Sequence, residues 1–229
     1  MFGFRLKEKC VTVMLLAALM ASGAGIAQAQ LSRRQRRETN ANRQARIARI
    51  VQDTYSHRWE VAGGGGYLRY RSGESLQRNN EITFWMTGTR YFNPKLGVVA
   101  DVRGAYGNAK IYNIGLITFN PQVSEYTFLA GPSYRFYAKE KTAVSAFAVG
   151  GVGLGKFDSG SKGIPSSLLG TWPSGYRPAF SAGVNFDYNF YPNLAARITP
   201  TYVGTTFGGS LQNNAGFNIG LVYRFGRNK

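Results

Sequence analysis

The segment from residue 215 to residue 225 alternates between two kinds of side chain, and this alternation strongly constrains the fold. Bulky apolar residues recur at every second position, and the positions between them include two glycines, Asn218 and Arg224. Successive side chains of an extended chain point to opposite faces. One face of this segment is therefore oily and aromatic and the other is mainly polar, which is typical of a strand between lipid and a polar interior.

Seven further segments of similar length repeat this character from Arg58 onward. The expected strands are 58–70, 81–92, 97–107, 124–137, 142–155, 178–190, 194–203 and 215–225. Short connectors at 93–95, 138–141 and 191–193 alternate with longer polar or glycine-rich connectors at 71–80, 108–123, 156–177 and 204–214. This predicts an all-β fold, an eight-stranded antiparallel up-and-down transmembrane β-barrel with periplasmic turns, outer loops and both termini inside.

The direction of the two faces separates a membrane barrel from a soluble one. A soluble ligand-binding barrel would turn its apolar set inward. An eight-stranded interior is just wide enough for side chains, so the small polar set suits it better than a full set of Phe and Tyr. Segments 81–92 and 142–155 have apolar residues on both faces, so the sequence does not determine their register or which face points inward. Pro132 and Pro200 each remove a ladder donor and predict bulges.

The first 29 residues read as an export signal. Arg5, Lys7 and Lys9 precede an apolar stretch from Val11 to Met20, and Ala27-Gln28-Ala29 is a small-x-small cleavage site. We therefore predict three parts: a signal peptide at 1–29, a basic periplasmic leader at 30–57 and an outer-membrane barrel at 58–229. A mean hydropathy of −0.23 excludes a helical multispan protein.

The leader carries much of the positive charge. Seven arginines lie between Gln30 and His57, in a chain whose formal net charge is +17. Ile47, Ile50 and Val51 fall at helical spacing, so the segment has the pattern of a short amphipathic helix. It is either a solvated leader or a segment that touches anionic lipid or enters the periplasmic mouth of the barrel. Nucleic acid is not an expected partner, because the chain is exported.

The ionisable residues assigned to the interior face form a balanced lumen charge network. Its members are Glu60, Asp101, Arg103, Glu125, Arg135, Asp187, Arg197 and Arg224. Asp187 and Arg197 should lie at one level on neighbouring strands, as should Glu60 and Arg224 if the first and last strands close the barrel. Buried charges are tolerated when they are paired. The network either fills the interior and holds the register, which we favour, or lines a narrow ion path.

The supply of catalytic residues argues against an enzyme. Lipid-modifying barrels generally need a histidine base, but the single histidine, His57, precedes the first strand, and the single cysteine, Cys10, lies in the signal. The usual zinc constellations are therefore not expected. The glycine runs at 63–66 and 150–153 lack the Lys-Ser/Thr ending of a phosphate loop. We expect no catalytic or metal site and no cofactor.

Three segments resemble the small OmpA-like or opacity-type outer-membrane barrel proteins. They are 190–197 (FYPNLAAR), the loop 204–209 (GTTFGG) and 220–225 (GLVYRF). The resemblance covers about residues 58 to 226 and implies location in the cell outer membrane of a Gram-negative-type bacterium. It also implies folding through the outer-membrane assembly machinery, which typically reads an aromatic residue ending the last strand, here Phe225.

The longer loops are where a surface function would reside. The candidate loop contacts are Lys156, Lys162, Trp172, Tyr176 and Arg177, which combine cations with aromatic anchors. The cations suit lipopolysaccharide phosphates, and the aromatic residues suit either recognition or simple interfacial anchoring. We predict a structural or surface-interaction role, with outer-membrane lipid and lipopolysaccharide as partners and any extracellular ligand unknown. The alternatives are a narrow porin-like channel and, third, a soluble periplasmic ligand-binding barrel.

Overall fold

A computed structural model describes residues 40–111, 121–159, 161 and 164–227. The predicted signal peptide and the start of the predicted leader lie outside the described residues. The elements are α2 (Asn40–Tyr55), β1 (His57–Arg71), β2 (Arg78–Tyr91), β3 (Leu96–Asn108), β4 (Gln122–Ala138), β5 (Thr142–Ser159), α3 (Ser166–Leu169), β6 (Gly175–Tyr191), β7 (Leu194–Thr205) and β8 (Gln212–Arg227). No helix in this part of the chain is long and apolar enough to cross a bilayer.

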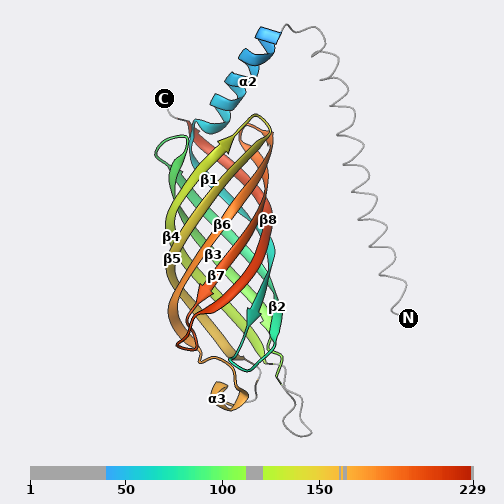
Figure 1. Ribbon diagram of the computed structural model, residues 1–229, viewed down its shortest axis with the longest axis vertical. Coiled ribbons are helices and arrows are strands. Elements are labelled where there is room, and N and C mark those ends of the chain that lie inside the picture. Colours follow the sequence, from blue (N-terminus) through green and yellow to red (C-terminus); the bar gives the residue numbers. More distant parts are fainter. Residues whose placement is uncertain (1–39, 112–120, 160, 162–163, 228–229) are drawn as a thin grey trace, which may run out of the picture. The chain divides into compact units, whose positions relative to one another are not determined.

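The eight strands form one closed antiparallel barrel in which each strand pairs with its neighbours in sequence and β1 pairs with β8 (Figure 1). This confirms the predicted fold. The short connectors after β2, β4 and β6 lie at one end, here called the turn end. The longer connectors, including α3, lie at the other, the loop end. The chain divides into two compact units, residues 1–49 and 50–229, and the barrel belongs to the second.

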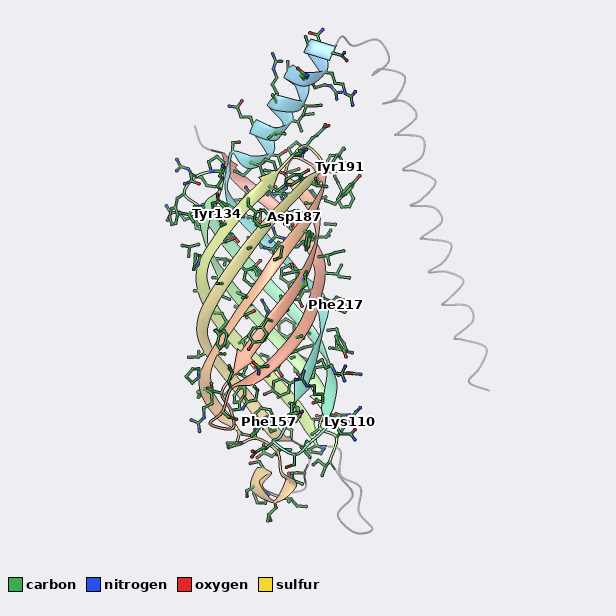
Figure 2. All side chains as sticks on the ribbon, viewed as in Figure 1. Lys110, Tyr134, Phe157, Asp187, Tyr191 and Phe217 are labelled. Carbon is green, nitrogen blue, oxygen red and sulfur yellow. The ribbon has the colours of Figure 1, made fainter. Side chains whose placement is uncertain are left out.

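Large apolar side chains cover the outside of the barrel, and small polar ones fill the inside. Phe186, Phe217 and Leu221 are 49%, 45% and 58% exposed, whereas Asn218 and Arg224 are buried. Figure 2 shows Phe217 on the outer wall, midway between Asp187 near the turn end and Phe157 near the loop end. The predicted orientation is confirmed. A soluble barrel with an inward apolar set is contradicted.

In β2, which has apolar residues on both faces, the space inside the barrel determines which large side chain points inward. Trp85 is 4% exposed and points into the barrel, while Phe84 and Met86 are exposed on the outer wall. Trp85 lies opposite Gly64 on β1, and Gly64 in turn lies opposite Gly220 on β8. A Cβ on Gly64 would come within 2.1 Å of the Ile219 carbonyl oxygen. These glycines bring β1 and β8 close together beside the indole, where the barrel closes.

The prediction that Pro132 and Pro200 mark bulges is wrong. The register shifts lie elsewhere, between Gln122 and Ser124, between Arg135 and Tyr137, and between Asn189 and Tyr191. Beside each proline the strand loses its pairing with one neighbouring strand, between Ala130 and Ser133 in β4 and between Ile198 and Thr201 in β7. Beyond this gap the pairing resumes in the same register. A proline lacks one donor, and the barrel accommodates this by interrupting the ladder locally.

Candidate functional site

The lumen holds three successive groups of buried polar side chains. At the turn end, Glu60 on β1 contacts guanidinium groups from three other strands. Arg135 Nη2 and Arg224 Nε each donate to Glu60 Oε2 at 3.1 Å, and Arg197 Nη2 donates to Oε1 at 2.5 Å. All four side chains are at least 97% buried. One carboxylate therefore joins β1, β4, β7 and β8 across the bore.

Asp187 on β6 completes this turn-end network. Arg197 binds it with two hydrogen bonds, Nε to Oδ1 at 2.6 Å and Nη2 to Oδ2 at 2.8 Å. Arg224 Nη2 donates to Asp187 Oδ2 at 3.0 Å and Arg224 Nη1 to Asn189 Oδ1 at 2.8 Å. Paired geometry of this kind offsets the desolvation of buried charge. Five strands are thereby linked by two carboxylates and three arginines.

Tyr55, the last residue of α2, covers this network at the turn end. Its hydroxyl donates to the Lys139 carbonyl oxygen at 2.8 Å and accepts from Asn189 Nδ2 at 2.9 Å. Its ring lies 4.8 Å from the Arg135 guanidinium carbon and 5.7 Å from that of Arg224. Burial raises the pKa of the Tyr55 hydroxyl above its ordinary value, although the Asn189 hydrogen bond and the two arginines act in the opposite direction.

Among the residues that the structure describes, the middle of the lumen holds one ion pair, on β3. Arg103 Nε donates to Asp101 Oδ1 at 2.7 Å and Arg103 Nη2 to Asp101 Oδ2 at 2.9 Å. Small cavities of about 20 Å³ and 10 Å³ lie on either side, and both are lined by Arg103 and Asn218. A cavity of this size holds about one water molecule. Side chains therefore occupy most of the space at this level of the lumen.

The loop-end part of the lumen contains two buried carboxyl groups, and neither lies within ion-pair distance of a cation among the described residues. Glu81 Oε1 accepts from Asn79 Nδ2 at 3.0 Å, and Asn79 Oδ1 accepts from Ser72 Oγ at 2.9 Å. Glu81 Oε2 and both oxygens of Glu125 have no hydrogen-bond partner among the described residues. Glu125 belongs to the predicted network, yet the structure places it apart from Glu60, Asp101 and Asp187, which are paired with arginines.

Aromatic side chains close the loop end above these carboxyl groups. Phe157, fully buried, lies 6.1 Å from the ring of Tyr70 and 5.1 Å from that of Phe207. Trp172 joins the same apolar cluster, and its Nε1 donates to the Arg71 carbonyl oxygen at 2.7 Å. We call Tyr70, Phe157, Trp172 and Phe207 the aromatic plug. The lumen is therefore covered at both ends, by Tyr55 and by this plug.

The candidate loop contacts separate into exposed and buried residues. Lys156, Tyr176 and Arg177 are exposed at the loop end, and Tyr176 is 69% exposed. Trp172 is 8% exposed and packs in the aromatic plug, which corrects the expectation that it contacts a partner at the surface. The connector after β5 folds back over the bore, and this buries the large apolar surface of the Trp172 indole. Lys162 lies outside the described residues.

Sequence reasoning missed Tyr55, Glu81 and the plug residues Phe157 and Phe207. Glu81 and Trp85 are an even number of positions apart and therefore lie on the same face of β2. Assigning Trp85 to the inside of the barrel would have placed Glu81 inside as well. Phe157 and Phe207 fall in segments that were expected to be loops, where alternation gives no signal. Tyr55 ends a helix, and nothing in the neighbouring sequence indicates that it contacts Lys139 and Asn189, which lie 84 and 134 positions further along the chain.

The fold and the lumen together define a closed, side-chain-filled barrel with an apolar exterior suited to lipid. A search of family models and a search of curated proteins find no match to the chain. Solved structures of small eight-stranded outer-membrane barrels are similar. Neisserial surface protein A has 14% identity and a TM-score of 0.52, with 73% of this chain and 97% of that chain covered. OprG from Pseudomonas aeruginosa has 13% identity and a TM-score of 0.51, covering 75% and 97%.

The attachment invasion locus protein Ail of Yersinia pestis is also among the matches. It has 17% identity and a TM-score of 0.48, with 74% of this chain and 99% of that chain covered. The similarity to Neisserial surface protein A and OprG concerns the fold. The chain thus has the architecture of a small eight-stranded outer-membrane barrel.

Proposed function

We propose that this protein is an integral barrel of the bacterial outer membrane, exported by a cleaved signal peptide, with a structural or surface-interaction role at its loop end. The observation that carries this proposal is the combination of a covered, side-chain-filled lumen with an apolar outer wall. An apolar wall of Phe, Tyr, Ile and Leu suits hydrocarbon. A lumen packed with side chains leaves the outer surface and the loop end as the places for interaction.

We place the turn end in the periplasm and the loop end at the cell exterior, because short periplasmic turns and longer outer loops are the rule in such barrels. The aromatic last strand, with Phe225 on its outer face, suits recognition by the outer-membrane assembly machinery. Cell fractionation and N-terminal sequencing test export. Recovery in the outer membrane with a new N-terminus at Gln30 is expected, and a soluble periplasmic protein would contradict the proposal.

Membrane insertion has a direct gel assay. A folded barrel in detergent should migrate differently before and after boiling, and recovery should require detergent. Identical migration of unheated and boiled samples would contradict the barrel in its membrane form.

Planar bilayers test the rival channel function. We expect no reproducible ohmic steps from the purified wild-type protein, since the two cavities in the lumen hold about one water each. Ohmic steps that disappear on substitution of Arg197 or Arg224 would establish conduction through the lumen and overturn a purely structural or surface role.

A further inference from the structure

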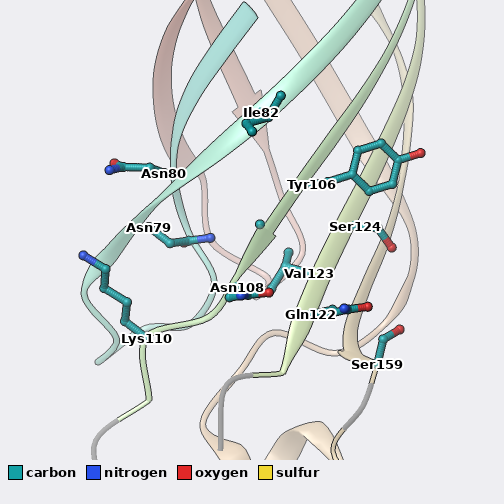
Figure 3. A pocket seen from close by; sticks show the side chains of 11 residues that line it. Asn79, Asn80, Ile82, Tyr106, Asn108, Lys110, Gln122, Val123, Ser124 and Ser159 are labelled. Carbon is teal, nitrogen blue, oxygen red and sulfur yellow. The ribbon is translucent and has the colours of Figure 1, made fainter. Parts of the chain in front are cut away.

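The outer wall of the barrel carries two adjoining cavities at the loop end, each lined by both polar and apolar side chains. The first, of about 590 Å³, lies over β2, β3 and β4 (Figure 3). The second, of about 430 Å³, lies over β4 and β5, and both are lined by Ser124. Their volumes fall in the usual range for small-molecule sites, roughly 300–1,000 Å³. We call the two cavities together the outer-wall groove.

The strand register arranges the groove in two rows. Ile82, Tyr106 and Ser124 are successive partners across β2, β3 and β4 and form the row nearer the apolar belt. Asn108 and Gln122 are partners in the next row, two residues further along each strand, which is roughly 7 Å. Amide side chains both donate and accept hydrogen bonds, as hydroxyl groups of a sugar require. The second row therefore has the chemistry of a saccharide site.

Two lysines add positive charge to the groove. Lys110 lines the first cavity, and Lys156, opposite Ser124, lines the second. In Figure 3 the Lys110 side chain lies on the opposite side of the cavity from Gln122 and Ser124. Asp158 also lines the second cavity, where its Oδ1 accepts from Ser174 Oγ at 3.0 Å. A lysine ammonium binds phosphate as a point charge, so the groove suits a saccharide that carries phosphates.

The wall beside the groove continues into the apolar belt. Ile82 is 76% exposed, and Met86 and Phe128 further along β2 and β4 are 58% and 50% exposed. An occupant with its polar part in the groove would therefore place an attached apolar part on these side chains. A free sugar would leave these apolar side chains to other lipids, whereas an amphiphile would contact both the groove and the apolar belt.

We infer that the outer-wall groove binds the phosphorylated saccharide headgroup of a glycolipid in the outer leaflet, with the acyl chains against the apolar belt. This inference rests on the proposed function, because it requires the loop end to face the cell exterior. It assigns the lipopolysaccharide contact to Asn108, Gln122, Lys110 and Lys156 on the wall of the barrel. The exposed residues Tyr176 and Arg177 are not needed for it.

Native mass spectrometry of the folded protein in detergent tests the groove, with lipid A, a bisphosphorylated diglucosamine lipid, as the probe. Wild-type protein should retain lipid A in preference to phosphatidylglycerol. The double variant K110Q/K156Q should bind lipid A about tenfold more weakly, since it loses two solvent-exposed charge contacts with phosphate. N108A/Q122A should reduce affinity about threefold to tenfold. The deacylated headgroup should bind more weakly than intact lipid A.

Matched controls come from other parts of the surface. Asn213→Ala removes an exposed amide on β8, outside the groove, and Lys139→Gln removes an exposed lysine at the turn end. Neither should change the affinity for lipid A. Equal affinity in wild type and K110Q/K156Q, no preference over phosphatidylglycerol, or equal binding of the deacylated headgroup would each overturn the inference.

The gel shift on boiling, run on every sample, separates the two levels of failure. Wild-type protein that shows the shift but no lipid A preference refutes the groove and leaves the membrane barrel standing. Wild-type protein without the shift refutes the proposed function itself. A variant that lacks the shift has not folded, and its lipid data are replaced by those of the single variants K110Q and K156Q.

Discussion

At the turn end of the lumen Glu60 contacts three guanidinium groups, whereas at the loop end Glu125, which is equally buried, has no hydrogen-bond partner among the described residues. Both side chains are 2% exposed. At the turn end ion pairs link five strands. At the loop end the contacts that close the lumen are those of the aromatic plug. Equal burial therefore does not imply an equal contribution to stability, because the contribution depends on what each carboxyl group meets.

The largest expected effect is that of Glu60→Gln. The change leaves Arg135, Arg197 and Arg224 with Asp187 as the one carboxylate of the turn-end network. Breaking a buried ion pair typically costs about 3–5 kcal/mol. Urea unfolding in a fixed detergent, followed by tryptophan fluorescence, measures the free energy of unfolding. Glu74→Gln, at an exposed loop position, is the control, and a loss below about 1 kcal/mol for Glu60→Gln would refute the importance of the network.

Phe157→Ala tests the other end and should have the next largest effect. Phe157 is fully buried against Tyr70 and Phe207, so its removal leaves a cavity in the aromatic plug. We expect a loss of about 3 kcal/mol in the same unfolding assay. Phe92→Ala, at a residue that is 61% exposed in the turn after β2, is the matched control. Similar small losses in both variants would show that the plug contributes little.

Tyr55→Phe removes the hydroxyl that covers the turn-end network and should cost about 1–2 kcal/mol, because its hydrogen bonds with Lys139 and Asn189 are lost. Burial raises the pKa of Tyr55. The neutral hydroxyl therefore stabilises the folded state fully below the unfolded pKa of about 10, and this stability is lost as pH rises through the higher folded value. The difference between wild type and Tyr55→Phe should shrink above about pH 10. A pH-independent difference would contradict this account.

Glu125→Gln should have the smallest effect and is the isosteric counterpart of Glu60→Gln. It replaces a buried carboxyl group whose oxygens have no hydrogen-bond partner among the described residues with a neutral amide. The free energy of unfolding should stay within about 1 kcal/mol of wild type or increase. A loss above about 2 kcal/mol, measured beside Glu60→Gln, would show that the two ends are stabilised in the same way.

Much of the architecture could be predicted because side-chain direction in a strand depends on local sequence. Phe186 and Phe217 are outside and Asn218 and Arg224 inside, as their alternation indicated. The lumen was less accessible to such reasoning. Asp187 and Arg197 are register partners on adjacent strands and could be paired from the short turn between them. The contact of Glu60 with Arg135 spans 75 residues and non-adjacent strands, so it depends on the tilt and closure of the whole barrel.

The sequence by itself determined the eight strands, the two faces of most of them and the alternation of short and long connectors, because period-two patterning and turn composition act over a few residues. The tertiary structure decided which charges meet, that Trp85 points inward, that Trp172 folds into the plug, and that Tyr55 covers the other end. These are packing choices. They depend on the space left inside a closed barrel, and that space exists only once β1 and β8 have paired.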